Sequence, residues 1–77
     1  MQLSDIKSMY HRHELVEAIV EPSLIANGWI VEFKTENGDI IPLTDFSGHE
    51  KCYRNLDIAT ATAQQVGFPS VRIDEPF

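Results

Sequence analysis

Histidine and cysteine are the residue types in this sequence with the most chemical potential. His49 and Cys52 lie three positions apart, a spacing that is compatible with binding of a metal ion. A structural zinc site needs about four ligands, and the sequence has no second pair with such a spacing. A cysteine nucleophile with a histidine base would need an oriented third group, and none is evident. The sequence therefore predicts no metal site and no catalytic residue, and packing is the expected role of Cys52.

His11 and His13 fall in a segment that is expected to be helical. Residues two apart on a helix point in directions that differ by about 200°, so these imidazoles cannot hold one metal ion together. His13 continues an apolar stripe and is expected to be hydrogen-bonded at the edge of the core, whereas His11 is expected to be solvated. The scattered glycines form no phosphate-binding motif, and we expect no cofactor.

Cationic and aromatic residues offer a different chemistry. Lys51 and Arg54, joined by Lys34, could form a basic patch near Tyr53, and aromatic rings among cations are typical of sites that bind single-stranded nucleic acids. However, 12 acidic against 6 basic side chains give a net charge of -6, which repels phosphate backbones. A solvated strand face is therefore the favoured interpretation of these cations.

Aromatic residues are the better candidates for contacts with a protein partner. So small a core cannot easily bury Trp29, Phe46 and Tyr53 together, and exposed aromatic side chains often anchor interfaces. With Lys51 and Arg54, these three residues form the predicted interaction surface. An unpaired strand at a sheet edge would offer a second docking position, in the simplest case to another copy of the chain.

Length and composition place the chain among small globular domains. Its 77 residues suffice for one core, and 43% hydrophobic and 23% charged residues are typical of a folded protein. The single cysteine excludes an intrachain disulfide and favours a reducing compartment, and no apolar run approaches the about 20 residues of a membrane span. We expect a single cytoplasmic domain over residues 1–77 that makes no contact with a membrane.

Hydrophobic periodicity predicts two helices. The first begins at a cap formed by Ser4 and follows an apolar stripe over residues 4–20, or extends to residue 27. The second covers residues 56–66, with Asn55 as its N-cap and Gly67 as its stop.

A period of two predicts strands at about residues 29–35, 39–44, 50–54 and 70–74. The resulting order is α-β-β-β-α-β. It predicts a small α+β domain with a mainly antiparallel sheet of three to four strands and with two helices on one face. Pro42 has no N–H to donate, so its strand must lack a neighbour that needs one at that point.

The Asn37-Gly38 pair signals a hairpin between the first two of these strands. A two-residue loop would mix the apolar faces of the strands. A three-residue loop, Glu36-Asn37-Gly38, places Phe33 opposite Ile41 and Val31 opposite Leu43 on one face. We therefore predict the longer loop, with Gly38 in the left-handed region and a negative φ at Asn37.

Turn, cap and core residues between positions 28 and 74 resemble a pattern in short, uncharacterised bacterial proteins, some of which are similar to plasmid-maintenance accessory proteins. The residues that carry the resemblance are Gly28-Trp29-Ile30-Val31-Glu32-Phe33, Asn37-Gly38, Leu43, Asp45, Tyr53-Arg54-Asn55-Leu56-Asp57, Ala59 and Gly67-Phe68. The resemblance implies a shared fold and transfers no functional residue.

These observations together predict a small bacterial protein-binding or regulatory accessory module without catalytic activity. Its partner is expected to be a protein, either a second copy or another chain. The alternative is a nucleic-acid-binding accessory protein that uses the local basic and aromatic patch, which the net charge disfavours.

Overall fold

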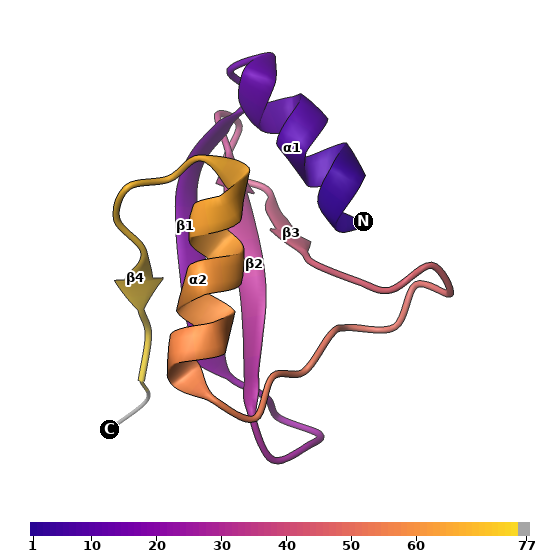
Figure 1. Cartoon of the computed structure of the whole chain (residues 1–77). Coiled ribbons are helices and arrows are strands. Elements are labelled where there is room, and N and C mark those ends of the chain that lie inside the picture. Colours follow the sequence, from indigo (N-terminus) through magenta and orange to yellow (C-terminus); the bar gives the residue numbers. More distant parts are fainter. Residues whose placement is uncertain (76–77) are drawn as a thin grey trace.

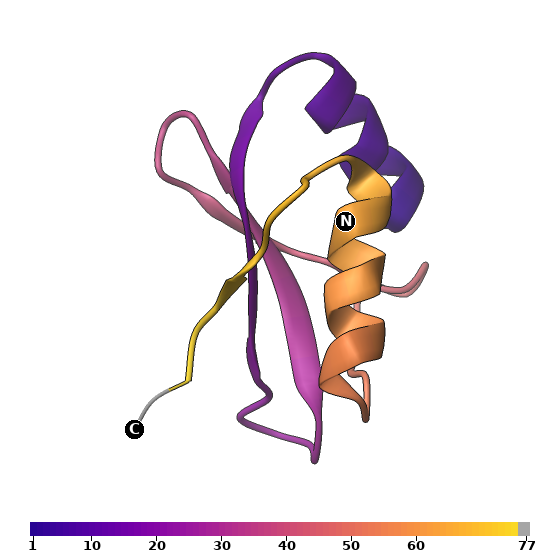
Figure 2. The same ribbon diagram turned by 60° about the vertical axis from the view of Figure 1, so that its left-hand side comes forward.

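A computed structural model describes residues 1–75 of the chain, which form a four-stranded sheet and two helices (Figure 1). The helices are α1 (Leu3–His11) and α2 (Leu56–Val66), and the strands are β1 (Leu15–Pro22), β2 (Trp29–Thr35), β3 (Ile40–Pro42) and β4 (Arg72–Ile73). The strand order is β3-β2-β1-β4, with β4 parallel to β1 and the other neighbours antiparallel. Figure 2 shows both helices on the same side of the sheet. The predicted α+β class and the order α-β-β-β-α-β are confirmed.

The core lies between the helices and one face of the sheet. Strand alternation puts the paired residues Ala18 and Phe33 on this face, together with the pair Val20 and Val31, and all four are fully buried. The helices cover them with five buried apolar side chains, namely Ile6, Met9, Ala59, Ala63 and Val66. The ring of Phe33 stacks on that of Phe68, with centroids 6.0 Å apart.

Helix α2 has the predicted bounds and caps. The Asn55 side chain accepts hydrogen bonds from the backbone N–H groups of Asp57 and Ile58, at 2.7 and 3.3 Å. The helix stops at Gly67, whose φ of 139° suits glycine. A Cβ at this position would collide with the ring of Tyr10, whose hydroxyl donates to the Gly67 carbonyl at 3.0 Å. The glycine therefore lets the end of α2 lie against α1.

The prediction of a first helix over residues 4–20 or to 27 is wrong beyond His11. Residues 15–22 form β1, a central strand that pairs with β2 on one side and with β4 on the other. Apolar residues of this strand are buried on both of its faces: Ala18 and Val20 face the helices, and Ile19 on the far face is only 3% exposed. Its near-continuous apolar run hides the period of two and matches helical spacing by coincidence.

Helix α1 ends in a Schellman motif that the sequence did not predict. The N–H of Glu14 donates to the Met9 carbonyl and that of His13 to the Tyr10 carbonyl, both at 3.0 Å. His13 adopts a φ of 61° and is exposed, so the expectation that it lies in a helix at the edge of the core is wrong. At the other end Gln2, rather than Ser4, occupies the N-cap position.

The predicted hairpin register is confirmed. Phe33 pairs with Ile41, and the N–H of Leu43 donates to the Val31 carbonyl at 2.9 Å. Gly38 has a φ of 90°, and Asn37 is not among the residues with positive φ. Strand β3 lies at the sheet edge, which explains how it accommodates Pro42.

Three predicted strands differ from those observed. Strand β3 is shorter than 39–44, because the Leu43 N–H makes the last bond to β2 and the Thr44 N–H turns to the Met1 carbonyl. The prediction of a strand at 50–54 is wrong, since this segment makes only the isolated bridges Thr44–Glu50 and Trp29–Tyr53. The predicted strand at 70–74 is reduced to β4, which pairs with β1 only at Ile19 and Val20.

His13 gives a direct test of the helix end. Replacing His13 with glycine should raise the free energy of unfolding by about 0.5 to 1 kcal/mol, because a left-handed conformation is costly for a residue with a Cβ. Urea denaturation followed by the fluorescence of Trp29 would measure the change. His11→Gly, a substitution inside the last helical turn, should instead lower the stability by about 0.5 kcal/mol. Destabilisation by His13→Gly would contradict the Schellman assignment.

Candidate interaction site

Three of the five residues predicted to form an interaction surface lie together. Trp29 and Tyr53 are joined by two backbone hydrogen bonds, of 2.6 and 2.8 Å, and both side chains are half-buried against the core. Arg54 is exposed and lines a shallow hollow with Trp29. The aromatic rings of this group therefore contribute mainly to packing.

Phe46 and Lys51 lie in a different place and line a second hollow. Phe46 is 86% exposed at the tip of a turn. Asp45 holds this turn by accepting hydrogen bonds from the N–H groups of Ser47 and His49, at 2.8 and 3.1 Å. Lys34 lines a third hollow beside β4. The cations predicted to form one basic patch are thus distributed over three hollows.

Gly28 allows the segment that carries Cys52 and Tyr53 to approach the start of β2. Its φ is 153°, and a Cβ there would lie 2.7 Å from the Cys52 Sγ and 2.5 Å from the Tyr53 carbonyl oxygen. Cys52 is exposed but lies against this glycine. His49 lies near Asp45, with Nδ1 and Oδ2 3.9 Å apart. Within residues 1–75 no three His, Cys, Asp or Glu side chains are grouped so that they could hold a metal ion.

The most exposed apolar residues belong to the loop of residues 23–28, between β1 and β2, and sequence reasoning missed them. Leu24 is 98% exposed and Ile25 is 87% exposed. The loop is nevertheless ordered by hydrogen bonds. The Ser23 hydroxyl accepts from the N–H groups of Ile25 and Ala26, at 3.3 and 3.2 Å, and the Ser23 N–H donates to the Gly28 carbonyl at 2.9 Å.

A sequence signal for this loop did exist. A pair of large aliphatic residues lies between Pro22 and Asn27-Gly28, which are both strong turn signals. Of the two predicted ends of the first helix, the one at residue 27 places this segment inside the helix, and neither alternative indicates that its side chains are exposed.

The face of the sheet opposite the helices, called here the helix-free face, carries several carboxylates. Alternation along β1 and β2 places Glu17, Glu21 and Glu32 on this face. Burial raises the pKa of Glu32 to about 7, with further contributions from hydrogen bonding to Glu21 and from the charges of Glu21, Glu50 and Asp74. Arg72 forms an ion pair with Glu17, with Nη1 and Oε1 3.5 Å apart. The acidic groups around Glu32 are therefore close enough to repel one another.

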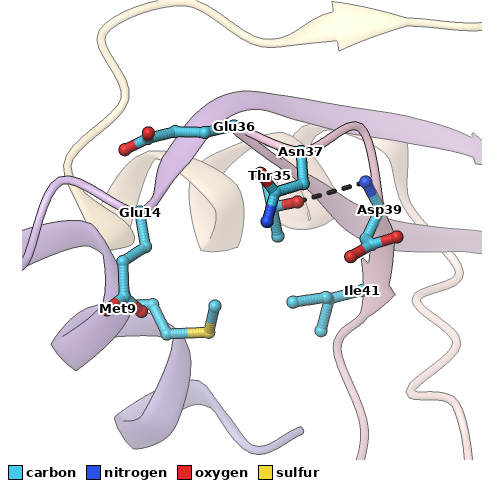
Figure 3. A pocket seen from close by; sticks show the side chains of 7 residues that line it. All are labelled: Met9, Glu14, Thr35, Glu36, Asn37, Asp39 and Ile41. Carbon is cyan, nitrogen blue, oxygen red and sulfur yellow. Dashed lines mark hydrogen bonds between the residues drawn. The ribbon is translucent and has the colours of Figure 1, made fainter.

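A hollow of about 430 Å³, called here the hairpin pocket, lies between the end of α1 and the β2–β3 hairpin (Figure 3). Its lining consists of Met9, Glu14, Thr35, Glu36, Asn37, Asp39 and Ile41. Met9 and Ile41 extend toward each other across its floor, and Asp39 stands above Ile41. The Thr35 hydroxyl accepts from the Asp39 N–H at 3.1 Å, which fixes the hairpin wall.

The fold is thus a small α+β domain with hollows at both ends of its sheet. Comparison of the chain with protein-family models, with curated proteins and with solved structures finds no match. The resemblance to short bacterial proteins therefore stays a prediction. Neither helix of the described chain is long and apolar enough to cross a membrane.

The pKa of Glu32 predicts a specific pH dependence of stability. The native state binds the Glu32 proton more tightly than the unfolded state, whose pKa is near 4.5. Stability contributed by this group should therefore fall as the pH rises from 4.5 to about 7. Glu32→Gln should stabilise the protein at pH ~8 by about 1 kcal/mol, after allowance for solvent screening, and have little effect at pH ~5.

Urea denaturation of both proteins at the two pH values would measure this difference. Glu36→Gln, which removes an exposed carboxylate of the hairpin pocket, is the matched control and should show a much smaller change with pH. An equal gain for Glu32→Gln at both pH values would contradict the assigned environment of Glu32.

Proposed function

We propose that this protein is a non-catalytic, protein-binding accessory module that engages its partner through the 23–28 loop. The observation that carries the proposal is the exposure of Leu24 and Ile25 on a loop held by its own hydrogen bonds. Adjacent large aliphatic side chains in water forgo about 1.5 to 3 kcal/mol each of burial free energy. A partner that covers them would recover part of this free energy.

The order of the loop supports binding by a preformed element. The Ser23 hydroxyl and the Gly28 carbonyl fix the backbone on both sides of the exposed pair. Binding therefore costs less conformational entropy than the ordering of a flexible segment would. The two side chains act as anchors that enter an apolar cleft of the partner.

The surroundings of Leu24 define the charge of the complementary surface. Leu24 lines a small hollow together with Glu21 and Asp74, and both carboxylates raise the pKa of Glu32 on the helix-free face. A partner with an apolar cleft and basic groups at its rim fits this arrangement, and its association should weaken at high salt. A nucleic acid is the weaker candidate, because the net charge is -6 and Lys34, Lys51 and Arg54 line separate hollows.

A photo-crosslinking amino acid at Ile25, introduced in the native cell, would test the proposal. We expect one dominant crosslinked protein. In a binding titration with that purified protein, the double variant Leu24→Ser/Ile25→Ser should bind at least about tenfold more weakly than the wild type. Its free energy of unfolding should change by less than about 0.5 kcal/mol, because exposed side chains contribute little to the fold.

Ile58→Ser is the matched control, since Ile58 is also an exposed aliphatic residue but lies on α2. It should leave the affinity unchanged. Equal affinity of the double variant and the wild type, or crosslinking to a nucleic acid instead of a protein, would refute the assignment.

A further inference from the structure

We infer that the hairpin pocket binds a primary ammonium group carried on an unbranched aliphatic chain, the chemistry of a lysine side chain or a free alkylamine. The pocket lies at the opposite end of β1 and β2 from the 23–28 loop. The inference is therefore independent of the proposed protein-binding loop.

The walls of the pocket are preformed. At the α1 end, the Glu14 N–H donates to the Met9 carbonyl at 3.0 Å, and the Glu36 N–H reaches the Glu14 carbonyl at 3.3 Å. At the hairpin end, the Thr35 N–H donates to the Asp39 carbonyl at 2.9 Å. These backbone bonds fix the pocket before any ligand arrives, which lowers the entropic cost of binding.

The floor selects an aliphatic chain. It is made by the buried thioether of Met9 and the half-buried side chain of Ile41, which point toward each other (Figure 3). A thioether adapts to ligands of irregular shape, and methylene groups gain free energy from contact with such a floor. The pocket lining contains no aromatic ring on which a guanidinium could stack.

The rim selects a positive charge, because all of its ionisable lining residues are carboxylic acids. Arg12 already pairs with Glu14, with Nε and Oε2 2.9 Å apart, and this hydrogen bond lowers the pKa of Glu14. Glu36 and Asp39 are exposed and form no salt bridge within residues 1–75. A bare metal ion is a poor occupant, since no group of acidic side chains in that range could hold one.

An NMR titration of the labelled full chain at neutral pH would test the inference. The two probes are Nα-acetyl-lysine methylamide and n-hexylamine, and the matched uncharged probe is Nα-acetyl-norleucine methylamide. We expect saturable shifts of the amides around Thr35 and Ile41 with millimolar affinity for the charged probes and no saturation with the norleucine compound. Tighter binding of the lysine compound would point to a partner's side chain, and tighter binding of hexylamine to a free amine.

Substitutions distinguish specific binding in the pocket from general attraction of a cation to a negatively charged protein. Asp39→Asn and Glu36→Gln should each weaken binding by about two- to fivefold, as expected for exposed charge pairs. Glu50→Gln makes the same change in net charge away from the pocket and should have no effect. Because n-hexylamine contacts more of the floor than n-propylamine, it should bind about fivefold or more tightly.

Either of two results would overturn the inference. One is equal binding of the lysine and norleucine compounds. The other is an equal effect of Glu50→Gln and Asp39→Asn, which would show attraction to the net charge alone. Neither result would affect the 23–28 loop, whose test uses different residues and a different readout.

Discussion

The antiparallel pairing of β1 with β2 is the constraint on which the rest of the structure depends. Seven pairs join the strands, from Leu15–Thr35 to Pro22–Trp29, and both strands carry buried residues on both faces. One face forms the core with the helices. The 23–28 loop lies at one end of the β1–β2 ladder and the hairpin pocket lies at the other end. Neither could form without this ladder.

The alternation of residues along this ladder also determines the electrostatics. Because Val20 and Val31 must face the helices, Glu21 and Glu32 must face the other way. Ile19 and Ile30 on that face are only 3% and 6% exposed, so they are covered although no helix lies on them. The carboxylates therefore stand on a partly dehydrated surface, and burial is the largest cause of the raised pKa of Glu32. The repulsion between the carboxylates of Glu21 and Glu32 is thus a consequence of the strand register that the core requires.

The sequence predicted the parts of the fold that local chemistry specifies. Asn55 and Gly67 bound α2 as expected, because a cap and a stop act within a few residues. The hairpin register followed from matching two apolar faces, which left only one acceptable loop. Strand β1 was missed, because its central position in the sheet depends on pairing with β2 and with β4, some 50 residues later in the chain, and no local pattern contains that information. Because β1 was not predicted, the left-handed conformation of His13 and the exposed loop after Pro22 could not be predicted either.

The absence of long-range pairing information from the local sequence also explains which exposed residues were predicted and which were missed. Trp29 and Tyr53 attracted attention as aromatic residues, yet Gly28 lets their backbones pair, and this pairing draws both side chains against the core. Leu24 and Ile25 have the composition of core residues, and only the early turn after β1 leaves them in water. Exposure is thus a property of the strand ends rather than of residue type. In a domain this small, the core is completed by the faces of β1 and β2. Aliphatic residues just beyond the ends of these strands have no interior left to enter, so Leu24 and Ile25 stay in water where the ladder stops.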